Sequence, residues 1–297
     1  VQEKQMTTVA DDNVFNIAVT GTFDDAQAAV KTIFGNVDFK RTHHLGSINS
    51  INWARILAQV VYYVYSCLHV AVHEKNRAVA FSVPTGNFGD IFAGFIAKRM
   101  LPEGSISKLV LGTNSNDILT RFVNEGDYSL GEVVATTSPS MDIQAASNFE
   151  RYLYYLMDKE PDLVREAMLK FSVDGKLYMQ NYLAQVKRDF SASAVTEDEV
   201  QETIARYYKD HRYVLDPHTA VGVRAAQQHR DQGVPMVCLA TAHPAKFPDT
   251  VAQAVGQPPE PPPSLVELEG KPSRCEVMDC SVEALMAYIE NHALKGP

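Results

Sequence analysis

The stretch VAFSVPTGNFGD, residues 79–90, followed by IFAGFIA, residues 91–97, decides how this sequence folds. Its first five residues predict a buried strand, Gly86 and Gly89 bound a turn, and the apolar run after them predicts a helix. The first backbone N–H groups of a helix have no partner inside it, and the helix dipole adds positive potential there. The two glycines leave the backbone unshielded, and Asp90 suits a first helical turn. The stretch therefore predicts an anion site, with an ordinary strand-to-helix turn as the alternative.

Similar segments recur along the chain and indicate the fold class. Residues 14–19, 108–113 and 234–241 read as further strands, and helical spacing separates them. This alternation predicts an α/β fold with three layers, in which helices cover both faces of a mostly parallel sheet. A helical insertion is expected over residues 148–209, because the apolar spacing there is helical throughout.

Composition and charge exclude two classes of partner. The formal net charge is −9, and the lysines and arginines form no block or stripe, so we expect no nucleic-acid binding. Residues 56–73 carry no formal charge and approach the length of a membrane-spanning helix. Gln59 and His69 interrupt this run where a helix would face lipid. We therefore expect a buried core helix and no membrane partner.

The four cysteines indicate the compartment. They form no CxxC pair and no ligand set accompanies them, so we expect reduced thiols, no metal site and a cytoplasmic location. The sequence begins with Val1 in a polar stretch, so we expect a processed, cloned or truncated N-terminus.

A second polar cluster precedes the long apolar helix. Asn49, Ser50, Asn52 and Arg55 surround Trp53, the only tryptophan. Helix capping explains one or two of these side chains, and a capped helix with solvated neighbours is the ordinary interpretation. The alternative is a second oxyanion site, to which Arg55 would contribute its charge.

Taken together, these motifs resemble those of the threonine synthase family, whose members are fold-type II pyridoxal-phosphate enzymes. The motifs appear in the family's order and occupy residues 5–8, 47–55, 84–90, 114–122, 140–143, 217–221 and 240–247. The resemblance implies a sheet like that of the tryptophan synthase β subunit. It also implies conversion of O-phospho-L-homoserine and water to L-threonine and phosphate, with pyridoxal 5'-phosphate as cofactor.

The resemblance also implies roles for particular residues. The cofactor phosphate would bind at Gly86, Asn87, Phe88, Gly89 and Asp90.

Thr241 would place its hydroxyl at the pyridine nitrogen of the cofactor. The substrate phosphate would bind at Asn49, Ser50, Asn52 and Arg55. Arginine suits that role because its guanidinium group binds phosphate in a bidentate manner.

The sequence departs from the family pattern at the Schiff-base lysine. In the family this lysine lies well upstream of the motif at residues 5–8, so we expect it upstream of Val1 and assign no catalytic residue in this chain. Lys40 lies in a polar segment after Gly35 that we expect to be a loop. It has a superficially similar context but matches a different part of the family, and Lys246 fits a structural or supporting role better.

The resemblance also implies a domain organisation. Residues 1–50 would be the remainder of a smaller N-terminal domain, 51–257 the large cofactor-binding domain, and 258–297 a Pro-rich spacer and an extension packed on the body. The missing N-terminal portion of the enzyme is then the expected partner of this chain.

Two alternative functions remain open at this stage. One is a threonine-synthase-like phospho-lyase, which eliminates phosphate from related phospho-amino acids. The other is a non-catalytic binding or signalling fragment that uses the same fold.

Overall fold

The computed structural model describes residues 2–21, 23–49, 52–73 and 78–292, and these form two compact units. One unit comprises Val1–Ser47 and Glu260–Pro297, and the other comprises Ile48–Pro259. The elements of the first unit are α1 (Gln2–Thr7), β1 (Ile17–Thr20), α2 (Phe23–Gly35), α3 (Val37–Thr42), α13 (Pro263–Val266), β8 (Glu276–Asp279) and α14 (Val282–His292).

The larger unit contains the predicted strand, turn and helix. Its first elements are α4 (Trp53–His73), β2 (Val79–Pro84), α5 (Gly89–Met100), β3 (Ile106–Thr113), α6 (Ile118–Glu125), β4 (Asp127–Ser129), α7 (Phe149–Leu156) and α8 (Pro161–Asp174). The others are β5 (Lys176–Tyr178), α9 (Leu183–Asp189), β6 (Ser191–Ala194), α10 (Glu197–His211), α11 (Pro217–His229), β7 (Met236–Cys238) and α12 (Pro248–Val255). Single 3₁₀ turns occupy Pro139–Met141, Gln180–Tyr182 and Pro244–Lys246.

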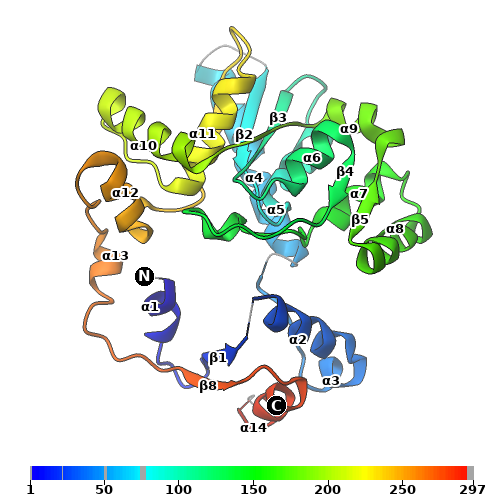
Figure 1. The fold of residues 1–297 in the computed structure, drawn as a ribbon, viewed down its shortest axis with the longest axis vertical. Helices are drawn as coiled ribbons and strands as arrows, with labels where there is room; N and C mark the ends of the chain where they lie inside the picture. Colours follow the sequence, from blue (N-terminus) through cyan, green and yellow to red (C-terminus); the bar gives the residue numbers. More distant parts are fainter. Residues whose placement is uncertain (1, 22, 50–51, 74–77, 293–297) are drawn as a thin grey trace. The chain divides into compact units, whose positions relative to one another are not determined.

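A four-stranded parallel sheet lies at the centre of this unit (Figure 1). Its order is β6-β3-β2-β7, so β2 is an inner strand with a partner on each side. Every residue of β2 is buried, as expected for a parallel strand covered on both faces.

Helices cover both faces of the sheet, which confirms the predicted three-layer α/β fold. On one face the Ser82 hydroxyl donates to the Gly222 carbonyl of α11 at 2.6 Å, and Gly222 itself lies against Pro84. On the other face Phe81 contacts the Tyr63 ring of α4, with ring centroids 4.8 Å apart. Alternate residues of β2 therefore face α11 and the α4–α5 pair.

The long helix α4 is buried along one side only. Ile56, Val60, Tyr63 and Cys67 belong to the core, at the three- and four-residue spacing of one helix face. By length and composition, Trp53–Val72 is the one helix among the described residues that could cross a membrane, although packing already occupies part of it. The expectation of a buried core helix is thus correct for one face and wrong for the opposite one, whose apolar side chains are exposed.

Gly94 permits the close contact between α4 and α5. A Cβ atom at this position would lie 2.6 Å from Tyr63 Cε1 and 3.0 Å from Leu109 Cδ2.

We expect Gly94→Ala to reduce the free energy of unfolding by about 1–3 kcal/mol, because the buried Tyr63 ring cannot move away. Urea denaturation measures this loss. Gly131→Ala is the control, since its Cβ would meet nothing closer than 3.5 Å, and equal stability of the two variants would contradict the prediction.

The region expected to be a helical insertion contains strands as well as helices. Residues 148–209 contain α7 to α10, but they also contain β5, which pairs antiparallel with β4, and β6, which joins the main sheet beside β3. The sequence of β6, SASA, has small residues with no strong apolar alternation, so its strand pairing depends on the neighbouring β3.

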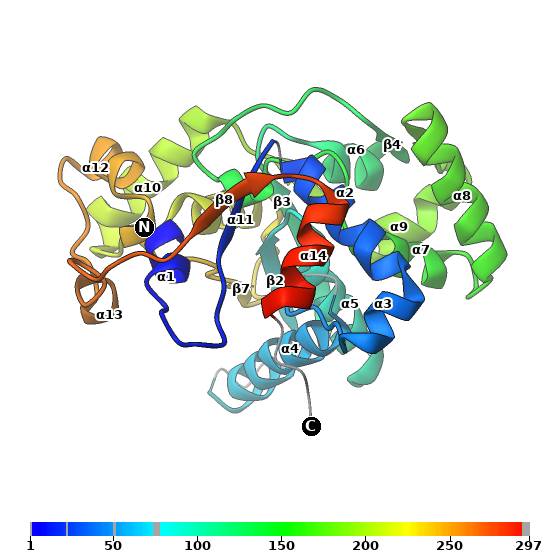
Figure 2. The same ribbon diagram turned by 90° about the horizontal axis from the view of Figure 1, so that it is seen from below.

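The smaller unit joins the two ends of the chain. Strand β8 pairs in parallel with β1, from Ile17 with Glu276 to Thr20 with Asp279, and the two strands lie side by side in Figures 1 and 2. The domain organisation expected from the sequence places these ends in separate parts, whereas this pairing groups them. The segment with Lys40, expected to be a loop, is the short helix α3, which begins after Asn36 as its N-cap.

Candidate functional site

The turn between β2 and α5 is held in an unusual backbone conformation. Phe88, the residue before α5, has a φ of 65°, a left-handed value that bulky residues rarely adopt. Its ring is almost completely buried and contacts Phe149, Tyr152 and Phe190 edge-on or at a tilt. The aromatic cluster thus fixes the turn by holding the Phe88 side chain.

This turn presents backbone donors without partners. Among the described residues, the backbone N–H groups of Gly86, Asn87, Phe88 and Gly89 donate no hydrogen bond. They precede the first turn of α5, a helix of 12 residues, where the dipole is positive. Converging N–H groups at a helix N-terminus can bind a phosphate group.

A cavity of about 580 Å³ lies beside this turn. Four of its lining residues come from α4, one is Asp90 at the start of α5, and three follow β7; they are Arg55, Ala58, Gln59, Tyr62, Asp90, Leu239, Ala240 and Thr241. The Gln59 side chain also lies against Gly89, since a Cβ atom there would be 3.9 Å from its Oε1 atom. The cavity therefore adjoins the free N–H groups.

Three of the predicted site residues meet at this cavity. Arg55 reaches it from α4, Asp90 from α5 and Thr241 from the segment after β7. The strands explain this arrangement, because β2 and β7 are parallel neighbours whose carboxyl ends lie at the same edge of the sheet.

Other predicted residues serve local structure. The Asn52 side chain accepts a hydrogen bond of 2.9 Å from the Ala54 N–H group, so it caps the start of α4. The Asn49 carbonyl accepts from the Asn52 N–H group, and neither asparagine lines the cavity. The side-chain oxygen of Asn87 accepts from the Ser147 N–H group at 3.4 Å, which orients the side chain and leaves its amide N–H groups to serve as donors. Ser50 lies outside the described residues.

Asp90 is held by Tyr63, a residue that no sequence motif indicates. The buried Tyr63 hydroxyl lies 2.8 Å from the Asp90 carbonyl and 3.0 Å from its Oδ1 atom. Burial, followed by the nearby carboxylate, raises the pKa of Tyr63 well above its usual range, so the hydroxyl remains a donor at neutral pH. Tyr63 thereby fixes the carboxyl group at the cavity wall.

The titration of Asp90 should make stability depend on pH. Burial raises its pKa to about 6, although the hydrogen bond from Tyr63 acts in the opposite direction. The pKa of an unfolded aspartate is about 3.9, so between these values the folded protein binds a proton that the unfolded chain does not. Stability should therefore decrease as the pH rises from about 4 to 6 and then level off.

We expect Asp90→Asn to remove this decrease. Above pH 7 the variant should be more stable than the unchanged protein by about 2–3 kcal/mol, and near pH 4 the two should be alike. Urea denaturation at several pH values measures the difference. The exposed Asp174 provides a control, Asp174→Asn, whose stability curve should run parallel to that of the unchanged protein. A parallel curve for Asp90→Asn would refute the assignment.

A polar loop packs against Gly86. Asp142 accepts hydrogen bonds from the side-chain amides of Asn114 (2.7 Å) and Asn116 (3.0 Å), and from the Thr136 N–H (2.9 Å) and hydroxyl (2.6 Å) groups. Both asparagines are buried at the end of β3. This network fixes residues 136–142, whose Ser140 carbonyl oxygen would lie only 2.7 Å from a Cβ atom on Gly86.

The start of α11 holds the same loop from the other side. The Ser140 N–H group donates to His218 Nε2 at 3.3 Å, so the ring proton lies on Nδ1, which is 3.2 Å from Asp216 Oδ1. Burial opposes ionisation of Asp216, but hydrogen bonds from His218 and Thr219 hold its pKa below the ordinary value. Pro217 and His218 stood out in the sequence as a motif, but their contact with the loop depends on tertiary structure.

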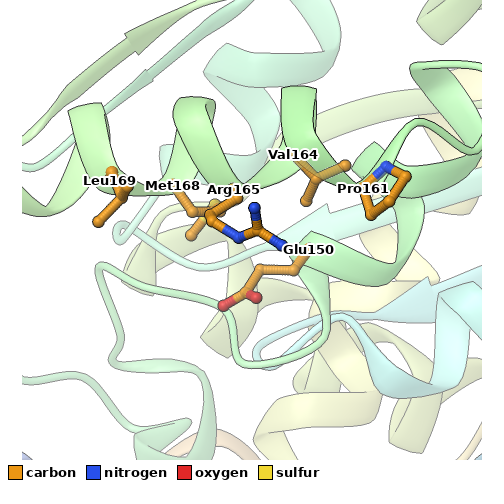
Figure 3. A pocket seen from close by; sticks show the side chains of 6 residues that line it. All are labelled: Glu150, Pro161, Val164, Arg165, Met168 and Leu169. Carbon is orange, nitrogen blue, oxygen red and sulfur yellow. The ribbon is translucent and has the colours of Figure 1, made fainter.

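A second cavity, of about 370 Å³, involves none of the predicted residues (Figure 3). Its walls come from α7 and α8, with the guanidinium group of Arg165 close to the Glu150 side chain in the view. Arg165 forms an exposed ion pair with Asp162 at 2.6 Å. Its lining is otherwise apolar.

Comparison with known proteins identifies the family. A family model described as "Threonine synthase, C-terminal" matches residues 219–289. The threonine synthase of Pseudomonas aeruginosa is 44% identical over 300 residues, a match that covers 100% of this chain and 63% of that relative. The chain belongs to the threonine synthase family. It corresponds to a C-terminal part, and it spans less than two thirds of that relative's length.

Solved threonine synthases confirm the fold. The pyridoxal-phosphate-bound enzyme of Brucella melitensis is 42% identical, with a TM-score of 0.88 over 98% of this chain and 62% of that structure. The yeast threonine synthase is 39% identical, with a TM-score of 0.86 and the same coverage. The predicted resemblance and the predicted fold-type II α/β architecture are therefore confirmed.

Proposed function

We propose that this chain is the C-terminal part of a pyridoxal-phosphate-dependent threonine synthase. The complete enzyme would convert O-phospho-L-homoserine and water to L-threonine and phosphate in the cytoplasm. The observation that carries the proposal is the cavity beside the β2–α5 turn, where Arg55, Asp90 and Thr241 meet next to unpaired backbone donors. A small-molecule substrate with a phosphate group suits these donors and this arginine.

The residues of the site fit the cofactor. The N–H groups of Gly86, Asn87, Phe88 and Gly89 would bind its phosphate, as the geometry at the start of α5 allows. Thr241, across the cavity, would hydrogen-bond the pyridine nitrogen through its hydroxyl group. When bound, pyridoxal phosphate supplies an electron sink for reactions at the substrate's carbon atoms.

The chain's own residues would position the substrate. Arg55 would bind the substrate phosphate, while Asn52 fixes the start of α4 from which Arg55 extends. No lysine is among the residues that line the cavity in the described part of the chain, so the lysine would come from the missing N-terminal portion. That portion is therefore the proposed partner of this chain.

An assay of the complete protein tests this function. With O-phosphohomoserine as the only substrate, we expect equal amounts of threonine and phosphate. Formation of 2-oxobutyrate in place of threonine would instead identify a phospho-lyase. Release of neither product by a correctly folded, cofactor-loaded protein would favour a binding role.

Replacement of Arg55 should affect the substrate more than the cofactor. Arg55→Ala in the complete protein is expected to raise KM for O-phosphohomoserine about 10- to 100-fold, because a charge-assisted hydrogen bond contributes about 1.5–3 kcal/mol. Pyridoxal phosphate should bind as before, as measured by its absorbance during titration. Arg165→Ala, at the second cavity, is the control and should leave KM unchanged. An unchanged KM for Arg55→Ala would contradict the assignment.

A further inference from the structure

Helix α4 presents three different faces. Ile56, Val60, Tyr63 and Cys67 are buried against the core. Arg55, Ala58, Gln59 and Tyr62 line the candidate site. The third face, which we call the outer face of α4, consists of Leu57, Val61, Tyr65, Leu68 and Val72.

The outer face is apolar and open. Its five side chains are between 49% and 74% exposed, and they recur at the spacing of a single helix face. Residues 56–73 carry no formal charge, and the polar side chain beside the outer face is that of His69, whose ring stacks on Tyr65 with centroids 5.7 Å apart. An apolar stripe of five exposed side chains along one helix is typical of a surface that packs against another polypeptide.

A membrane does not fit this helix. A spanning helix is in contact with lipid or other apolar partners along its length, whereas α4 carries Arg55 and Gln59 on the face beside the cavity. Its opposite side is packed against α5 through Tyr63 and Gly94. Only the outer face of the helix is therefore free to meet a partner.

Two observations identify the partner as the polypeptide that this chain lacks relative to the family. The Pseudomonas aeruginosa relative matches this chain over its whole length, but the match covers only 63% of the relative. In addition, α4 provides four of the eight residues that line the cavity, and none of the eight is a lysine. Because α4 forms half of the cavity wall, a segment that brings a lysine to this cavity can also contact α4, whose outer face borders the residues that line the cavity.

We propose that the outer face of α4 is the docking surface for the missing N-terminal portion of the enzyme. This inference rests on the proposed function, because the catalytic lysine is what requires the N-terminal portion to reach the cavity beside α4. The N-terminal portion would present an apolar surface of its own, and docking would bury the five side chains while closing the site beside them.

Photocrosslinking in the complete protein tests the proposal. The photoreactive residue p-benzoylphenylalanine replaces Tyr65 on the outer face or, as a control, Tyr178, which is 56% exposed in β5. We expect the label at Tyr65 to form an intramolecular crosslink to residues that precede Val1, identified by mass spectrometry. The label at Tyr178 should not form it.

Other crosslinking outcomes would overturn the proposal. These outcomes are a crosslink from Tyr65 to a second copy, to other residues of this chain or to membrane lipid, and the absence of any crosslink. Crosslinking is measured independently of activity, so its result distinguishes failure of the docking proposal from failure of the proposed function. A crosslinked protein that makes no threonine would refute the function alone, and an active protein without the crosslink would refute the docking surface alone.

A charge on the outer face provides a second measurement. Leu68→Asp in the complete protein is expected to lower the Tm by at least about 4 °C, because docking would bury the introduced carboxylate. Val173→Asp, at an 82% exposed position of α8, should leave the Tm within about 1 °C of the unchanged protein. Equal Tm values for the two variants would argue against docking at this face.

Discussion

Gly86→Ala is expected to disrupt the candidate cofactor site and to destabilise the protein. The new Cβ atom would lie 2.7 Å from the carbonyl oxygen of Ser140 and 3.2 Å from Met141 Cα, and both are backbone atoms. Hydrogen bonds to His218 and the network of Asp142 hold that backbone in place. The loop and the turn must therefore separate, which moves the N–H groups away from their common point.

The expected loss is about 3 kcal/mol in the free energy of unfolding, at the upper end of the range for overpacked sites. In the complete protein, the affinity for pyridoxal phosphate should fall at least about 10-fold, equivalent to 1.4 kcal/mol. Chemical denaturation and absorbance titration measure the two quantities. Gly131→Ala is again the control, because its Cβ would have only ordinary contacts. Normal cofactor affinity in Gly86→Ala would show that the turn does not bind the phosphate.

Asp142→Ala should produce a loss of similar size for a different reason. The carboxylate accepts four hydrogen bonds, including those from the side-chain amides of Asn114 and Asn116, which are almost completely buried. Removing it takes one acceptor from each of these amides and the acceptor of the Thr136 N–H group. The amide of Asn114 keeps hydrogen bonds to Thr136 and Ser138, and that of Asn116 keeps one to the Val134 carbonyl. A buried donor that loses its acceptor costs about 1–3 kcal/mol, so we expect a total loss of about 2–4 kcal/mol.

Thermal and urea unfolding measure this loss, and Asp174→Ala provides the control at an exposed position of α8. Asp142→Asn should be intermediate, because its amide retains one acceptor oxygen but brings an additional donor into the network. If Asp142→Ala unfolds like the control, the network does not stabilise the loop. The cofactor affinity should then also be unchanged, since the loop meets the turn where the Ser140 carbonyl oxygen lies against Gly86.

The elements that are predicted correctly are those whose residues show a strong local pattern of apolar runs and glycines. The strand β2, the turn at Gly86 and the helix α5 follow from an apolar run, two glycines and a second apolar run, all within about twenty residues. Strand β6 was missed because its small residues carry no such pattern, and it becomes a strand through pairing with β3. The helix α3 was expected to be a loop because its six residues are mostly polar.

The same distinction applies to the candidate site. The sequence indicates that Arg55, Asp90 and Thr241 have suitable chemistry, and the structure places all three at one cavity. The sequence does not reveal that Tyr63 holds Asp90, because the contact joins two helices. It also does not reveal that Asn52 is a helix cap, since an asparagine before a helix can serve a ligand or the backbone.

The sequence by itself determined the α/β class, the parallel arrangement and the Gly-bounded turn between β2 and α5, because each is indicated by local patterns of residues close together in the chain. Only the tertiary structure decided how the turn is held, because the loop of Asp142 and the start of α11 reach it from distant segments. It also decided that α4 has an open apolar face. From its sequence alone, an apolar helix is expected to be buried. Whether another segment covers each of its faces depends on tertiary contacts, which the residues of the helix do not specify.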